Sequence, residues 1–273
     1  MTMPRNLFFV RHGESEGNVA NQKAKTGDLS SFTDEFVTTP GRKWKLTEKG
    51  EAQARLAGEW LQKELNRVAV SSDRRNFVSP YVRTRQTAGY LGLQYRGKSV
   101  EWFVNRTLRE RDWGDIDSIP KKLFLDDPAY KWNSQKEKQD PLYWRPPGGE
   151  SIQDVAENRV RNFLDTLHRE CGDHTVVAVT HGEFMRAARI ILERVSDELY
   201  DEWENSNEEK IHNCMILQYS KENETSRSQI KIPGTHLQCV RKVYPVVEEN
   251  RMEIGPWIKL NFTKPTNEDL LSI

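Results

Sequence analysis

Short, unbroken runs of apolar residues recur along the chain and alternate with longer segments in which apolar residues are spaced three or four positions apart. Short uninterrupted runs are typical of strands that are buried on both faces of a parallel sheet. The clearest are LFFV at 7–10 and TVVAV at 175–179. The same criterion adds strands near 77–78, at 100–104 and at 238–247.

Helical spacing is clearest between residues 47 and 65, where Thr47 is a suitable N-cap. Similar spacing predicts helices over residues 81–93, 151–167 and 183–195. Strands and helices therefore alternate. This order predicts an α/β fold, a three-layer sandwich with a mostly parallel central sheet flanked by helices on both faces.

A chain of 273 residues can form one large domain or two small ones. We expect a single domain over residues 1–273, with an insertion at about 115–147 and a C-terminal extension after about 220. The insertion is polar, rich in Lys, Asp, Pro and Trp, and weakly periodic. We interpret it as a segment that could lie over a pocket.

The charge balance is neutral, with 41 basic and 41 acidic residues. No global field recruits nucleic acid or an anionic bilayer, so we expect neither partner and any anion site must be local. The apolar run near the N-terminus is too short for a signal peptide, and no stretch is long enough to span a membrane. Three scattered cysteines disfavour a disulfide framework or zinc knuckle, and we expect a cytoplasmic protein.

A histidine follows the first apolar run. The string RHGESEGN places Arg11, His12 and Gly13 at the C-terminal end of the strand, where open α/β sheets bind ligands. Gly13 permits close backbone approach, and the polar turn leading to Asn18 can present N–H groups to an anion. A lone histidine can instead be a hydrogen-bonded core residue, but the full string RHGES is much rarer by chance than RHG.

The second apolar run ends in the same way, with His181 and Gly182. Because the C-terminal ends of parallel strands share one edge of a sheet, we expect His12 and His181 to meet there. A pair of buried structural histidines is the alternative.

Two arginines, Arg83 and Arg85, lie near the start of the helix at 81–93. Guanidinium groups bind phosphate oxygens bidentately and stay charged at any working pH. Arg11 together with Arg83 would therefore clamp a phosphate, whereas a solvated helix face suits Arg85 better.

A carboxylate, Glu110, follows the strand at 100–104 and is placed to donate and accept a proton. Local sequence alone does not separate it from Asp112, Asp115 and Asp117, and a surface salt bridge is also compatible with it.

Taken together, the motifs resemble the histidine phosphatase superfamily, in its phosphoglycerate mutase-like branch, from about residue 6 to about 219. The resemblance rests on six ordered strings: RHGESEGN at 11–18, LTEKGEAQA at 46–54, SPYVRTRQTA at 79–88, LRER at 108–111, GGES at 148–151 and THG at 180–182. It implies these site residues: a phosphorylated nucleophile, His12; a phosphate pocket of Arg11, Arg83, His181 and Gly182; an accessory contact, Asn18; and an acid/base, Glu110.

The same resemblance implies that neither a metal nor another cofactor is needed. Nearby arginines should disfavour the protonated imidazole of His12, which leaves a nucleophilic nitrogen free. We expect its other nitrogen to bond to a backbone carbonyl.

The chain also departs from the family pattern. LRERDWG continues as DIDSIPKK, TGDLSS at 26–31 replaces the Thr-Gly-Trp segment of the mutases, and EEKIHNCMILQY replaces their IPTG-like sequence. These departures make mutase activity less favoured.

The motifs leave four functions open. The first is a phosphatase acting on a small phosphorylated metabolite or a phosphoprotein. The others are a phosphoglycerate mutase, a phosphate-binding module without turnover, and a metal hydrolase built on the two HGE triplets, whose spacing is unlike HExxH.

Tryptophans and cations gather around the insertion. The tryptophans at 102, 113, 132 and 144 either pack the insertion onto the domain or form an apolar wall over the substrate. The cations Lys121, Lys122, Lys131 and Arg145 either meet a second anionic group or form a solvated face.

Overall fold

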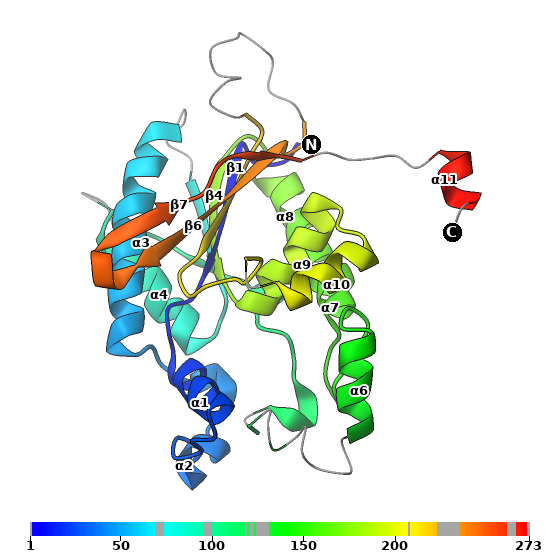
Figure 1. Ribbon diagram of the computed structural model, residues 1–273. Helices are drawn as coiled ribbons and strands as arrows, with labels where there is room; N and C mark the ends of the chain where they lie inside the picture. The colour runs from blue at the N-terminus through cyan, green and yellow to red at the C-terminus, as the bar shows by residue number, and fades with distance from the viewer. Residues whose placement is uncertain are drawn as a thin grey trace.

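The computed structural model describes residues 2–68, 74–95, 100–117, 119–120, 123, 131–206, 208–222, 235–260 and 266–271. One β-sheet runs through this part of the chain in the order β3-β2-β4-β1-β5-β6-β7, and β8 pairs with β6 (Figure 1). The strands are β1 (Asn6–Arg11), β2 (Arg74–Val78), β3 (Phe103–Val104), β4 (Thr175–Thr180), β5 (Ile216–Ser220), β6 (Cys239–Val246), β7 (Arg251–Ile254) and β8 (Ile258–Lys259).

The α/β three-layer arrangement is confirmed, and the sheet is mixed. Strands β3, β2, β4 and β1 are parallel, whereas β5, β6, β7 and β8 pair antiparallel with their neighbours. The antiparallel part lies in the C-terminal region. There a single 3-10 turn, η6 (Val247–Glu249), followed by Asn250 with a left-handed φ of 47°, connects β6 to its antiparallel neighbour β7.

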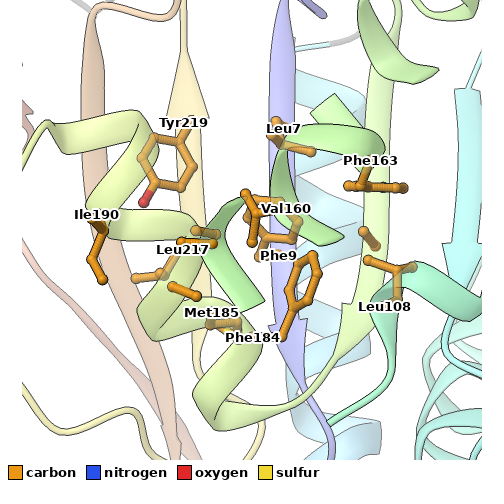
Figure 2. Close-up of a cluster of buried hydrophobic side chains, with 14 of the residues drawn as sticks. Leu7, Phe9, Leu108, Val160, Phe163, Phe184, Met185, Ile190, Leu217 and Tyr219 are labelled. Atoms are coloured by element: carbon orange, nitrogen blue, oxygen red, sulfur yellow. The ribbon is translucent and has the colours of Figure 1, made fainter. Parts of the chain in front are cut away.

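Helices cover both faces of the sheet (Figure 1). Alternate residues of β1 point to opposite sides, so Phe8 and Val10 pack under α3 (Glu48–Val68) and α4 (Val82–Leu93). On the other face, Leu7 and Phe9 pack against the helical segments within residues 152–193. Phe9 lies against Phe163 and Phe184 there (Figure 2).

The helices expected from spacing are present with shifted ends. The helix expected over 151–167 comprises α7 (Ile152–Asp154), a π-helical turn η4 (Val155–Val160) and α8 (Arg161–Glu170). The one expected over 183–195 is α9 (Gly182–Glu193). Further helices that the spacing did not indicate are α1 (Glu16–Lys25), α2 (Asp34–Thr38), α6 (Lys131–Gln139), α10 (Asp197–Asn205) and α11 (Asn267–Leu271).

Three parallel strands end at the same edge of the sheet, and the residues that follow them form the candidate site. Chain segments leave β1, β2 and β4 there, at His12, Ser79 and His181. The expected strand at 100–104 contributes only Phe103–Val104 at the outer edge, where both side chains are exposed. Among the described residues, no helix combines the length and apolar character needed to cross a bilayer.

Candidate active site

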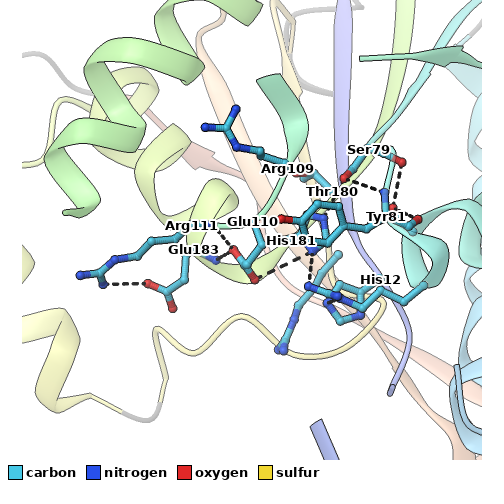
Figure 3. Close-up of polar contacts among 12 residues, drawn as sticks. His12, Ser79, Tyr81, Arg109, Glu110, Arg111, Thr180, His181 and Glu183 are labelled. Carbon is cyan, nitrogen blue, oxygen red and sulfur yellow. Dashed lines mark hydrogen bonds and ion pairs between the residues drawn. The ribbon is translucent and has the colours of Figure 1, made fainter. Parts of the chain in front are cut away.

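The two histidines that end β1 and β4 meet at this edge. The ring centroids of His12 and His181 are 5.2 Å apart and their planes are inclined by 65°. Both side chains are almost fully buried. The juxtaposition expected from the two strand ends is therefore present (Figure 3).

Arg83 joins the two rings. It lies in the first turn of α4, is 6% exposed, and donates from Nε to His12 Nε2 and from Nη2 to His181 Nδ1, both at 3.1 Å. Its third nitrogen donates to the carbonyl of Gly41 at 2.7 Å. Arg85, on the same helix, is exposed, so Arg83 is the arginine that faces the site.

The protonation of His12 follows from its partners. Nδ1 lies 2.7 Å from the Gly13 carbonyl, which can only accept, so Nδ1 carries the hydrogen and Nε2 carries the lone pair. The backbone carbonyl expected for this nitrogen is thus Gly13. Burial, then Arg83 and Arg11, hold the pKa of His12 well below its usual value, so burial outweighs the arginines that the sequence suggested as the cause.

His181 is fixed in a similar way. Because the Arg83 guanidinium can only donate, His181 Nδ1 accepts, and Nε2–H donates to Ser79 Oγ at 2.8 Å. Burial and Arg83 hold its pKa well below the usual value. Ser79 was not singled out from the sequence, although its place directly after β2 is the same strand-end signal that marked the histidines.

Arg11 reaches the site from the end of β1. Its Nη1 donates to the carbonyl of Ile211 at 2.5 Å, and burial lowers its pKa. A Cβ on Gly182 would lie 3.4 Å from Arg11 Nε, so the absence of a side chain there leaves room for the guanidinium.

Glu110 lies in the loop after the short helix η2 (Arg106–Leu108). Its Oε1 accepts from the backbone N–H of Arg111 at 3.1 Å and of Glu183 at 3.2 Å, and its Oε2 is 3.9 Å from His181 Nδ1 (Figure 3). Burial, then the Glu183 carboxylate, raise the pKa of Glu110. The competing residues Asp112, Asp115 and Asp117 are all exposed.

Asn18 lies in the first turn of α1 and lines the same cavity as His12 and Glu110. Its Oδ1 accepts from the backbone N–H and hydroxyl of Ser15, both at 3.1 Å, and from Asn213 Nδ2 at 3.0 Å. The loop before α1 fits closely against α3, since a Cβ on Gly13 would lie 2.3 Å from the carbonyl oxygen of Gly50.

A cavity of about 810 Å³ opens onto these residues. Arg11, His12, Arg83 and Glu110 line it, as do Asn18 and Gly182. The wider walls combine charged side chains, among them Lys25, Arg42, Arg186 and Lys210, with bulky ones: Phe32, Trp44, Tyr81, Trp113, Ile116, Ile119, Trp144 and Ile211. The insertion therefore borders the cavity, as the sequence suggested.

The tryptophans divide between two places. Trp113 and Trp144 line the cavity and flank the guanidinium of Arg111, at 4.6 and 5.4 Å from the ring centroids. Trp102 instead packs against the core under α3 and α4, so its grouping with the insertion was wrong. Of the cations, Arg145 is exposed and paired with Asp154. Lys121, Lys122 and the side chains of Lys131 and Trp132 lie outside the described residues.

The ligand atoms of His12, Glu110 and His181 lie within 4.8 Å of one another, a spacing that could hold a metal ion. Arg83, however, donates to a nitrogen of each histidine, and Arg11 lies beside them. One guanidinium bonded to both histidines, and a second close enough to lower the pKa of each, favour an anion over a cation. The residues therefore fit a phosphate better than a metal.

Comparison with known proteins decides the family. The model of the histidine phosphatase superfamily (branch 1) matches residues 7–228. The chain belongs to this superfamily.

Proteins similar to this chain include a mutase by sequence and two phosphatases by fold. A 2,3-bisphosphoglycerate-dependent phosphoglycerate mutase from Methylorubrum populi is 30% identical over 198 residues, which cover 70% of this chain and 80% of that protein. A mycobacterial glucosyl-3-phosphoglycerate phosphatase has a similar fold, with a TM-score of 0.58, 24% identity, and coverage of 79% of this chain and 92% of the other. Phosphoserine phosphatase from Entamoeba histolytica gives a TM-score of 0.55, 20% identity, and coverage of 78% and 89%.

Proposed function

We propose that the protein is a phosphatase that hydrolyses phosphomonoesters through a phosphohistidine on His12. The observation that carries the proposal is the contact of Arg83 with both His12 and His181 at the base of a cavity, with Glu110 beside them. The pocket combines an imidazole nucleophile, fixed cations and a carboxyl group whose pKa is raised. We propose that residues 1–273 act as one domain around it.

In the first half reaction the ester phosphate displaces Arg83 from His12 and takes its N–H groups, together with those of Arg11. His12 Nε2 then forms a bond to phosphorus as the bond from phosphorus to the alcohol oxygen breaks. The protonated carboxyl of Glu110 gives its proton to that oxygen, and the alcohol leaves. The raised pKa of Glu110 favours the protonated form that this step requires.

In the second half reaction a water molecule attacks the phosphohistidine. Glu110, now a carboxylate, takes a proton from the water, the bond from phosphorus to Nε2 breaks, and inorganic phosphate leaves. The Gly13 carbonyl keeps the Nδ1 hydrogen in place throughout, so His12 returns to its starting tautomer. The two guanidinium groups stabilise charge on the phosphoryl oxygens in both steps.

The size of the cavity favours phosphate transfer to water over transfer back to a small substrate. A mutase must exclude water and hold a bisphosphorylated intermediate while it turns. A cavity of about 810 Å³ lies in the range of pockets that bind drug-sized ligands, which are much larger than phosphoglycerate. Bulky walls such as Trp113 and Ile116 fit a leaving group larger than a three-carbon acid.

A phosphoglycerate mutase is the second candidate, because relatives such as the Methylorubrum populi protein carry that name. Phosphate release from a panel of phosphomonoesters, measured for wild type and His12→Ala with and without a chelator, separates the candidates. Turnover that resists the chelator and disappears in the variant supports the phosphatase. Interconversion of 2- and 3-phosphoglycerate, without net release of phosphate, would support the mutase instead.

A further inference from the structure

The segment of residues 211–215, between α10 and β5, lies directly against the end of β1. Its backbone makes three contacts there. The carbonyl of Ile211 accepts from Arg11 Nη1 at 2.5 Å, the N–H of Cys214 donates to the His12 carbonyl at 3.2 Å, and the carbonyl of Met215 accepts from the Arg11 N–H at 3.0 Å. The segment therefore supports both residues of the Arg-His pair.

One side chain of this segment links His12 to Asn18. Asn213 Nδ2 donates to the His12 carbonyl at 3.2 Å and to Asn18 Oδ1 at 3.0 Å. Asn18 Oδ1 also accepts from the backbone N–H of Ser15 at 3.1 Å. These hydrogen bonds form a continuous chain from the His12 carbonyl, through the amides of Asn213 and Asn18, to the N–H of Ser15.

The two ends of this hydrogen-bond chain fix the orientation of both amides. The His12 carbonyl can only accept, so Asn213 must turn its NH₂ group toward it. The Ser15 N–H can only donate, so Asn18 must turn its oxygen toward it. A reversal of either amide would set donor against donor or acceptor against acceptor. The NH₂ group of Asn18 is consequently turned away from Ser15 and Asn213, on a residue that lines the cavity.

We infer that Asn213 is a positioning residue for phosphate recognition. It holds the amide of Asn18 so that Nδ2 donates to a phosphoryl oxygen of the bound substrate, without touching the substrate itself. This inference rests on the proposed function, since it assumes that the cavity binds the phosphate group beside His12.

The surroundings hold the segment in place. Glu209, just before it, accepts from Arg189 Nη1 of α9 and from Lys242 Nζ of β6, both at 2.6 Å. Cys214 adopts a left-handed φ of 53°, which turns the backbone back into β5. Through Lys242, strand β6 of the C-terminal extension thereby anchors the segment that carries Asn213.

A double-mutant cycle tests the inference. The dissociation constant of inorganic phosphate is measured by calorimetry for wild type, Asn18→Ala, Asn213→Ala and the double variant. Each single substitution is expected to weaken binding about tenfold, the size of one lost hydrogen bond to a charged group. The double variant should be no weaker than Asn18→Ala, because Asn213 acts through Asn18.

Control variants separate this role from a general loss of structure. Asn66→Ala, which removes an exposed asparagine bonded to Gln62 on α3, should bind phosphate as wild type does. If Asn213→Ala does not fold, Asn213→Ser, whose hydroxyl is too short to reach both acceptors, takes its place in the cycle.

The outcomes are distinct. If the loss of phosphate affinity in the double variant equals the product of the two single losses, the positioning role is overturned. Unchanged phosphate binding in Asn213→Ala would overturn it as well. Either result leaves the phosphatase proposal standing. A non-additive cycle in a protein that hydrolyses no phosphomonoester would support the positioning role and overturn the phosphatase. A wild-type protein that binds no phosphate would overturn both.

Discussion

Arg83 donates from Nε to the lone pair of His12 Nε2 at 3.1 Å, the same nitrogen that would attack phosphorus. The contact engages the nitrogen that acts as the nucleophile in the proposed reaction. In the proposed reaction an incoming phosphate oxygen takes over this N–H group and frees the nitrogen.

Replacement of Arg83 should therefore be costly even when the charge is kept. Arg83→Lys removes the fork that reaches His12, His181 and the Gly41 carbonyl at once. We expect kcat/KM to fall about 10²–10³-fold, as for other groups that stabilise a transition state. The matched control is Arg85→Lys, on the exposed side of the same helix, which should behave as wild type. Equal losses in both variants would contradict the assignment.

The role of Glu110 can be tested with leaving groups of different basicity. In Glu110→Gln, esters of alkyl alcohols should be hydrolysed about 10²–10⁴-fold more slowly, because the leaving oxygen receives no proton. p-Nitrophenyl phosphate, whose leaving group needs no proton, should instead give a rapid burst of nitrophenol followed by slow turnover. Stopped-flow absorbance records both phases. Absence of the burst, or an equal loss in Asp112→Asn, would argue against this role.

Glu183 should tune the pH dependence of the reaction. Its carboxylate is one cause of the raised pKa of Glu110, and the first step requires Glu110 in its protonated form. Loss of the Glu183 charge lowers the pKa of Glu110, so the alkaline limb of the pH-rate profile in Glu183→Gln should move to lower pH. A limb that stays in place, or moves to higher pH, would show that Glu183 does not act on Glu110.

Stability should fall on the acid side because of His12 and His181. Both have pKa values held below 6.5 in the folded protein, so below pH 6.5 the unfolded chain binds protons that the folded protein does not. The loss per histidine approaches about 1.4 kcal/mol per pH unit as the pH falls well below 6.5. Urea unfolding between pH 5 and 7 should therefore show a shallower slope in His12→Gln than in wild type. Parallel slopes would mean that His12 is protonated when folded.

Much of the site could be predicted because its residues stand at strand ends. His12 and His181 each follow an apolar run, and the parallel pairing of those runs brings the two rings together. Arg83 could be preferred over Arg85 because one side of a helix near a sheet edge is buried. These signals are local in sequence, and the parallel half of the sheet follows from them.

The remaining features depend on long-range contacts that no local pattern encodes. Asn213 meets Asn18 across 195 positions of sequence, and Ile211 meets Arg11 across 200. Strand β5 was not predicted because the polar Gln218 interrupts the apolar pattern of ILQYS. Its side chain is nevertheless fully buried, because Glu64 and Arg241 satisfy its hydrogen bonds. The strand expected at 238–247 is β6 (Cys239–Val246), but its antiparallel pairing through β5 was not predicted.

In the proposed mechanism the phosphoryl group is carried on His12, and this phosphohistidine can be observed directly. Wild type is mixed with a phosphomonoester that it hydrolyses, quenched in base within milliseconds, and digested for mass spectrometry. Acid-labile phosphate on the peptide that contains His12, formed and lost at the rate of turnover and absent from His12→Ala, is the expected result. Undiminished turnover in His12→Ala, or turnover in wild type with phosphate on no histidine, would contradict the account.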